Sequence, residues 1–206
     1  IEIARKLIGA AEEIGCAPRK YSAWAGLGQE DSLWSLYARR VVPDVLFDTT
    51  LAGNPMLAIL GRGTLLSDIP FGPLLVDDAY VAAPYASFWL RIRDVAGADM
   101  DEVLTQLNVN GPQTQHPRAP DGMAGMWLDL LPGYLNSTAP QHGTRYDIIV
   151  DDFDFHPVLE LLQETTGEVP RFDLYRREHN TTSVLIEWVR QNWPCPTAHT
   201  LQRTLL

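Results

Sequence analysis

The richest cluster of residue types that could do chemistry is the run DDFDFH, from Asp151 to His156. In an extended strand, Asp152, Asp154 and His156 would share one face, because successive side chains alternate. Two carboxylates and an imidazole can hold a divalent cation, as a metal-dependent hydrolase requires. The competing interpretation is a solvated strand face opposite two buried phenylalanines, which is a far commoner arrangement. We therefore predict no catalytic metal and no cofactor, and keep the hydrolase as an alternative.

A second candidate is the glycine pair in Gly61-Arg62-Gly63-Thr64. A phosphate-binding P-loop needs four residues between its glycines and a lysine before the Ser or Thr. The dinucleotide fingerprint needs a third glycine at position 66, where this chain has leucine. The pair therefore favours a turn, and Gly72-Pro73 then begins a short buried strand over 74–76. We interpret the whole stretch as scaffold.

The residues that could serve in nucleophilic or acid–base catalysis do not have the sequence spacing of a known catalytic motif. The chain has no Gly-x-Ser-x-Gly elbow, and Cys195 lies between two prolines. His179 stands beside Glu178 in a charged run that is typical of a solvated surface. None of these groups has the mutual spacing of a catalytic constellation. We therefore predict that the protein is not an enzyme.

Hydrophobic periodicity indicates the elements that would position these residues. Short apolar and aromatic runs predict strands at 33–38, 56–60, 74–76, 88–92, 126–130, 146–150 and 172–175. Helical spacing predicts helices at 3–14, 41–47, 99–107, 157–165 and 182–193. Strands and helices interleave, which predicts an α/β (mixed α+β) fold with a mixed sheet flanked by helices. The polar connector 137–143 divides the chain into a mixed α/β domain, 1–140, and a smaller α+β or helical lobe, 141–206.

Composition excludes two classes of partner. The chain of 206 residues carries a formal net charge of −10, which repels nucleic acid. No run approaches the roughly 18 apolar residues of a membrane span, so we expect no membrane partner.

Cys16 and Cys195 lack metal-ligand spacing. They are expected to be free thiols in a reducing cytoplasm.

The order of several short motifs resembles a known family. They are Leu36-Tyr37, Pro43-Asp44, Gly63-Thr64, Gly72-Pro73-Leu74-Leu75-Val76, Trp89 and Pro120-Asp121-Gly122. In this order and approximate spacing, over about residues 33 to 140, they resemble the type VI secretion effector chaperones. The resemblance implies a bacterial, cytoplasmic, non-catalytic adaptor. Its partners would be a secreted toxin effector and the VgrG spike onto which the effector is loaded.

An adaptor needs an exposed apolar surface rimmed by charge. The segments 111–122 and 127–134 combine aromatic bulk with polar neighbours. We predict that Trp127 and Tyr134 lie at a partner surface, with Arg118 and Arg145 as charged contacts. Burial of Trp127 in the core is the alternative. A small-molecule sensor whose aromatic residues line a pocket is a further alternative function.

Overall fold

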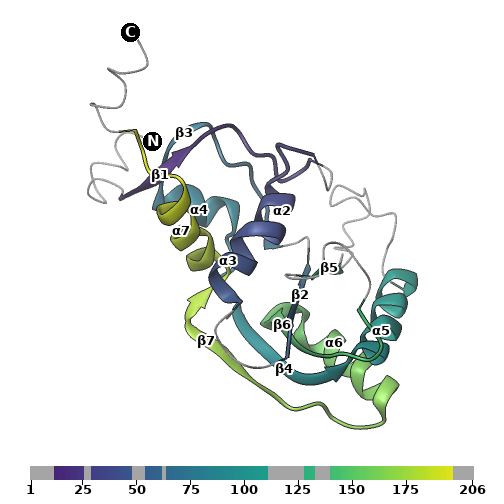
Figure 1. Cartoon of the computed structure of the whole chain (residues 1–206). Helices are drawn as coiled ribbons and strands as arrows, with labels where there is room; N and C mark the ends of the chain where they lie inside the picture. The colour runs from purple at the N-terminus through teal and green to yellow at the C-terminus, as the bar shows by residue number, and fades with distance from the viewer. Residues whose placement is uncertain are drawn as a thin grey trace.

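The computed structural model describes residues 12–25, 29–47, 54–61, 64–110, 128–132 and 140–196. It has a mixed α+β fold with two sheets flanked by helices, which confirms the predicted fold class (Figure 1). Its elements are β1 (Glu13–Ala17), α2 (Leu33–Leu36), the π-helix η1 (Tyr37–Val41), α3 (Val42–Leu46), β2 (Met56–Gly61), β3 (Gly72–Leu75), α4 (Val76–Ala82), β4 (Phe88–Ala96), α5 (Gly97–Asn110), β5 (Leu128–Pro132), β6 (Arg145–Asp151), α6 (Asp152–Thr166), β7 (Phe172–Asn180) and α7 (Thr181–Asn192).

The larger sheet has five strands in the order β5-β2-β6-β4-β7. Strands β2 and β6 run parallel, whereas β5, β4 and β7 run antiparallel to their neighbours. Because β2 and β6 are parallel, their carboxyl ends meet at one edge of the sheet. Strand β4 begins at this edge and β7 ends there, since Phe88 pairs with Asn180.

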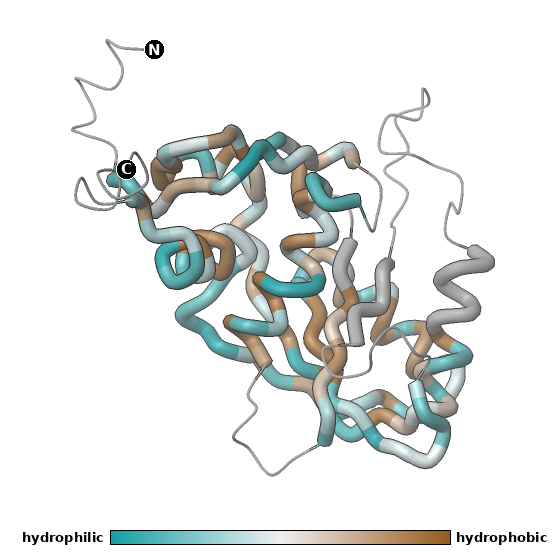
Figure 2. Tube along the Cα trace, turned by 45° about the horizontal axis from the view of Figure 1, so that its top comes forward, coloured by the Kyte–Doolittle hydropathy of each residue, from teal (hydrophilic) through white to brown (hydrophobic). Residues whose placement is uncertain are grey.

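The two faces of this sheet belong to two hydrophobic clusters. Ile149 and Trp89 pack with residues of α2, η1, α3 and α7. Ile148 and Val150 pack with residues of α5 and α6 instead. The alternation along β6 follows from the period of two in a strand. Both clusters make hydrophobic residues dense along the strands in the middle of the molecule (Figure 2).

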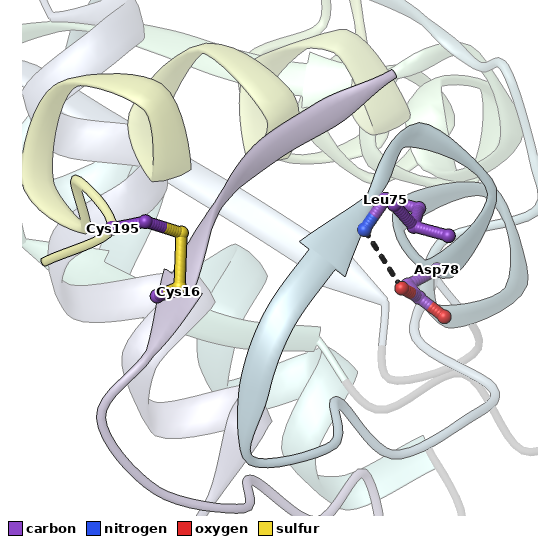
Figure 3. The surroundings of a disulfide bond; sticks show 4 residues. All are labelled: Cys16, Leu75, Asp78 and Cys195. Carbon is purple, nitrogen blue, oxygen red and sulfur yellow. Dashed lines mark hydrogen bonds between the residues drawn. A yellow bond between two sulfur atoms is a disulfide. The ribbon is translucent and has the colours of Figure 1, made fainter. Parts of the chain in front are cut away.

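The smaller sheet pairs β1 with β3 and lies beside α7. Gly72 begins β3 with φ of 97°, a left-handed conformation that glycine adopts at little cost. Leu74 is 1% exposed, so the predicted buried strand is confirmed, although it begins at Gly72 and ends at Leu75. At the strand's end, Asp78 accepts a hydrogen bond of 2.8 Å from the backbone N–H of Leu75 (Figure 3).

The two cysteines form a disulfide, so the expectation of free thiols is wrong. Cys16 in β1 and Cys195 after α7 are 179 residues apart in sequence, but their Cα atoms are 4.8 Å apart (Figure 3). The backbone N–H of Cys16 also donates to the carbonyl oxygen of Trp193 at 2.7 Å. The fold therefore brings the two cysteines together. The cytoplasmic location stays a prediction, and the cysteines no longer support it.

The expected strand over 33–38 is also wrong, because this segment is helical. Ser32 caps α2 by accepting a hydrogen bond from the backbone N–H of Ser35 at 3.1 Å. The buried positions along the segment recur with helical spacing: Leu33, Trp34, Tyr37, Ala38, Val41, Val42, Val45 and Leu46. The expected helix start near Pro43 is confirmed, since proline stands in the first turn of α3.

The other expected elements are largely confirmed. The strands expected at 56–60, 88–92 and 146–150 are β2, β4 and β6, and the one at 126–130 is β5, shifted by two residues. The helices expected at 99–107, 157–165 and 182–193 are α5, α6 and α7. Most of the helix expected at 3–14 lies outside the described residues, and Glu13 and Ile14 belong to β1.

The expected division at residue 140 stays a prediction. Strands from both sides of it share the five-stranded sheet, because β6 pairs with β2 and β4.

Among the described residues, no helix is long and apolar enough to cross a membrane.

Candidate functional site

The edge of the larger sheet where β2 and β6 end is the best-placed site in the fold. Ligands of open α/β sheets bind outside the carboxyl ends of parallel strands, where the following loops diverge. Four segments meet at this edge: 64–66 after β2, 83–88 leading into β4, 151–153 from the end of β6 into α6, and 180–182 from the end of β7 into α7. These four segments are called the site edge below.

Hydrogen bonds tie the segments of the site edge to one another. The backbone N–H of Leu66 donates to the carbonyl oxygen of Ala82 at 2.9 Å, immediately before the second segment. The backbone N–H of Thr181 donates to the carbonyl oxygen of Ser87 at 3.1 Å. The hydroxyl of Thr181 donates to the carbonyl oxygen of Tyr85. Segments that are distant in sequence thus form one connected surface.

The site edge exposes large apolar and aromatic side chains. Phe153 is 68% exposed, and Tyr85, Phe88 and Leu66 are 54%, 49% and 40% exposed. Exposed aromatic side chains gathered on one surface are unusual unless they contact a ligand or partner. Planar rings of this kind stack on aromatic ligands.

Beneath this surface lies a buried polar pair. Asp151, the last residue of β6, is 2% exposed and accepts a hydrogen bond of 3.3 Å from the hydroxyl of Thr64. Tyr37, which is fully buried, donates to the carbonyl oxygen of Thr181 at 2.8 Å. Burial, and then the charge of Asp151, raises the pKa of the Tyr37 hydroxyl well above its ordinary value. The buried layer directly beneath the site edge therefore contains hydrogen-bonded polar groups.

The DDFDFH run does not form the expected solvated strand face, nor the metal-binding face that was its alternative. Residues from Asp152 onwards begin helix α6, where acidic residues in the first turn are favourable. Phe153 is exposed and Phe155 is 5% exposed, so the two rings point in different directions as a helix requires. In a helix, residues two apart do not share a face, and the triad of Asp152, Asp154 and His156 is not assembled. The described residues contain no group of three or more His, Cys, Asp or Glu that could hold a metal ion.

The opposite end of the sheet carries a cluster of ion pairs beside an exposed ring, Phe172, which is 47% exposed. Arg93 donates to Asp173 at 2.7 and 3.0 Å, and Arg91 donates to the same carboxylate at 3.1 Å. These contacts, with Arg93 first, lower the pKa of Asp173 to about 2. The site edge and this end thus differ in chemistry.

Three of the four residues predicted at a partner surface lie outside the described residues: Arg118, Trp127 and Tyr134. The fourth, Arg145, begins β6 and pairs with Asp94 at 2.5 Å. It lies at the end of the sheet away from the site edge, because β6 ends at Asp151. The partner-binding role of the four residues stays a prediction.

With this geometry in hand, comparison with known proteins identifies the family. The model of the family described as "NAD nucleotidase, C-terminal domain" matches residues 21–126, just over half of the chain. The chain belongs to this family. The matched range includes β2 and β4, and it contains two of the four segments of the site edge, 64–66 and 83–88. No curated protein matches the chain by sequence.

Solved structures show the same fold. The 5'-nucleotidase of Candida albicans superposes with a TM-score of 0.67 at 14% identity, over 92% of this chain and 42% of that one. A 5'-nucleotidase precursor of Thermus thermophilus gives 0.60 at 14% identity, over 95% of this chain and 39% of that one. The NAD nucleotidase of Haemophilus influenzae gives 0.54 at 12% identity, over 95% and 38%. The chain thus spans about two fifths of the length of these proteins.

The family match corrects the functional interpretation of the sequence. The type VI effector chaperone assignment is wrong, and so are the toxin effector and the VgrG spike as partners. The expectation of a protein unrelated to catalysis is also wrong, because the family is a domain of an enzyme. The misleading motifs were dipeptides and short turns, which recur in unrelated folds because turn chemistry demands Gly and Pro.

Phe153, a candidate site residue by its exposure and position, is not among the residues that the sequence singles out. It was assigned to the buried face of a strand, opposite the carboxylates. The signal that would have found it is the pair of acidic residues followed by a helical apolar pattern, which is typical of a helix beginning at Asp152.

Proposed function

We propose that this chain is the nucleotide-binding domain of a nucleotidase, and that the site edge holds the base of the substrate. The observation that carries the proposal is Phe153, a ring exposed at the carboxyl end of a parallel strand in a nucleotidase family fold. Stacking of a base on an aromatic side chain contributes about 1–3 kcal/mol. Tyr85 and Phe88 supply further exposed rings at the same edge.

The charge and the length of the chain indicate which part of the nucleotidase reaction it would serve. A chain with a net charge of −10 does not attract phosphates over its surface in general, so recognition of the uncharged base is the favourable role. Hydrolysis of the nucleotide is assigned to the part of the enzyme that this chain does not span, since it covers about two fifths of the solved nucleotidases.

Calorimetric titration of the purified chain with adenosine, AMP and NAD tests the proposal. We expect binding of all three, with Phe153→Ala weakening each affinity by about tenfold through the lost stacking. The matched control is Phe71→Ala, which removes an equally exposed ring (72%) from the turn before β3, away from the site edge. Absence of binding by the unaltered chain, or equal losses in the two variants, would refute the proposal.

A further inference from the structure

The carboxylate of Asp151 lies under the site edge and is covered by it. Its residue is 2% exposed at the last position of β6, and the exposed Phe153 follows two residues later. Burying a carboxylate is unfavourable unless its partners compensate for the lost hydration. The hydrogen-bond partners of Asp151 therefore show which segments of the chain this carboxylate connects.

One partner is Thr64, which is separated from Asp151 by 87 residues in sequence. The Thr64 hydroxyl donates to Oδ2 of Asp151 at 3.3 Å, and Thr64 itself is 6% exposed. Thr64 is the third residue after the end of β2, whereas Asp151 immediately precedes α6. This hydrogen bond joins the segment that follows β2 to the segment that carries Phe153.

The surroundings of Asp151 are buried and closely packed. Trp89, which is 0% exposed, stands opposite Asp151 in the antiparallel pair of β4 and β6. Tyr37 is within electrostatic reach of the carboxylate and is itself fixed by its hydrogen bond to Thr181. A carboxylate packed among such groups has little freedom to move, so the segments bonded to it are held in fixed positions.

We propose that Asp151 is a positioning residue, which fixes the segment after β2 relative to Phe153 through Thr64. The proposal rests on the nucleotide-binding function given above. Asp151 does not touch the ligand; it sets the distance between the two segments that do. A ligand that stacks on Phe153 then meets the segment after β2 in a preorganised geometry, and preorganisation raises affinity by removing an ordering cost.

A double-mutant cycle separates this role from plain stability. Asp151→Asn keeps the volume but removes the charge, and Thr64→Val removes the donor at similar size. We expect Thr64→Val, which breaks the hydrogen bond, to weaken adenosine binding by about tenfold, and Asp151→Asn, whose neutral amide oxygen accepts more weakly, to weaken it less. The double variant should bind no more weakly than Thr64→Val alone, because both substitutions act on one hydrogen bond. The control is Asp173→Asn, which alters a sheet carboxylate paired with Arg93. It should lower the melting temperature and leave adenosine affinity unchanged.

Hydrogen exchange provides the readout that does not need a ligand. Asp151→Asn should speed amide exchange in residues 64–66 and 152–155 and leave it unchanged in β7. Additive losses in the cycle, or affinity losses that follow the fall in melting temperature, would overturn the positioning role. If the unaltered chain binds no adenosine, the proposed function fails. The exchange measurement then still tests the positioning role: unchanged exchange at 64–66 in Asp151→Asn would overturn it, and faster exchange there would uphold it.

Discussion

The two ends of the described fold are held by different means. The disulfide region, formed by Gly15, Cys16, Trp193 and Cys195, joins β1 to the segment after α7 by a covalent bond and close packing. The site edge is held by hydrogen bonds between segments and keeps its rings exposed. The first arrangement serves stability and the second leaves surface available to a ligand. We therefore expect substitutions in the two regions to separate stability from binding.

Removal of the disulfide should have the largest effect on stability. The bond closes a loop with a sequence separation of 179, so its loss in Cys16→Ser with Cys195→Ser frees much of the unfolded chain. The expected loss is about 2–5 kcal/mol of unfolding free energy. Urea denaturation of the variant and of the reduced unaltered chain should agree. Adenosine affinity measured well below the melting temperature should be unchanged; a matching loss of affinity would show that the two regions are coupled.

Gly15→Ala should have the next largest effect. A Cβ at this position would lie 2.6 Å from the carbonyl oxygen of Trp193 and 2.8 Å from Cγ1 of Val189. Strand β1 would have to move away from α7, at an expected cost of about 1–3 kcal/mol. Thermal denaturation measures the loss. Gly143→Ala is the matched control, because a Cβ there meets no atom within 4 Å. Equal melting temperatures of the two variants would contradict the close approach.

Asp173→Asn should have the smallest effect, and that effect should depend on pH. The lowered pKa of Asp173, about 2 against an ordinary 3.8, means that its ionised form is bound more tightly in the folded chain. This contribution is present above about pH 4 and is lost as pH falls towards 2. Because the side chain is 38% exposed, solvent screening limits it to about 1 kcal/mol. Unfolding free energies of the two chains should differ at pH 7 and converge near pH 2; a constant difference would exclude the ion pairs as its cause.

Much of the larger sheet could be predicted from the sequence, but its site could not. Strands β2, β4 and β6 have compact apolar runs, because each is buried and the pattern is local. The strand predicted over 33–38 is wrong, since a short aromatic run suits a strand and its helical spacing becomes visible only over the longer segment from Leu33 to Leu46. The strand predicted for the DDFDFH run is wrong for a similar reason: six alternating residues suit a strand, and the helical pattern becomes visible only when the run is read together with the residues that follow it in α6.

The sequence by itself determined the mixed fold class and most of the elements. These properties depend on composition and on patterns within about a dozen residues. The tertiary structure decided which distant residues meet, such as Cys16 with Cys195 and Thr64 with Asp151. Such contacts depend on the parallel pairing of β2 with β6 and on the packing of α7 against β1, neither of which leaves a local pattern in the chain. The family follows from the match of residues 21–126 to its model, whereas the solved structures show the fold that these residues adopt.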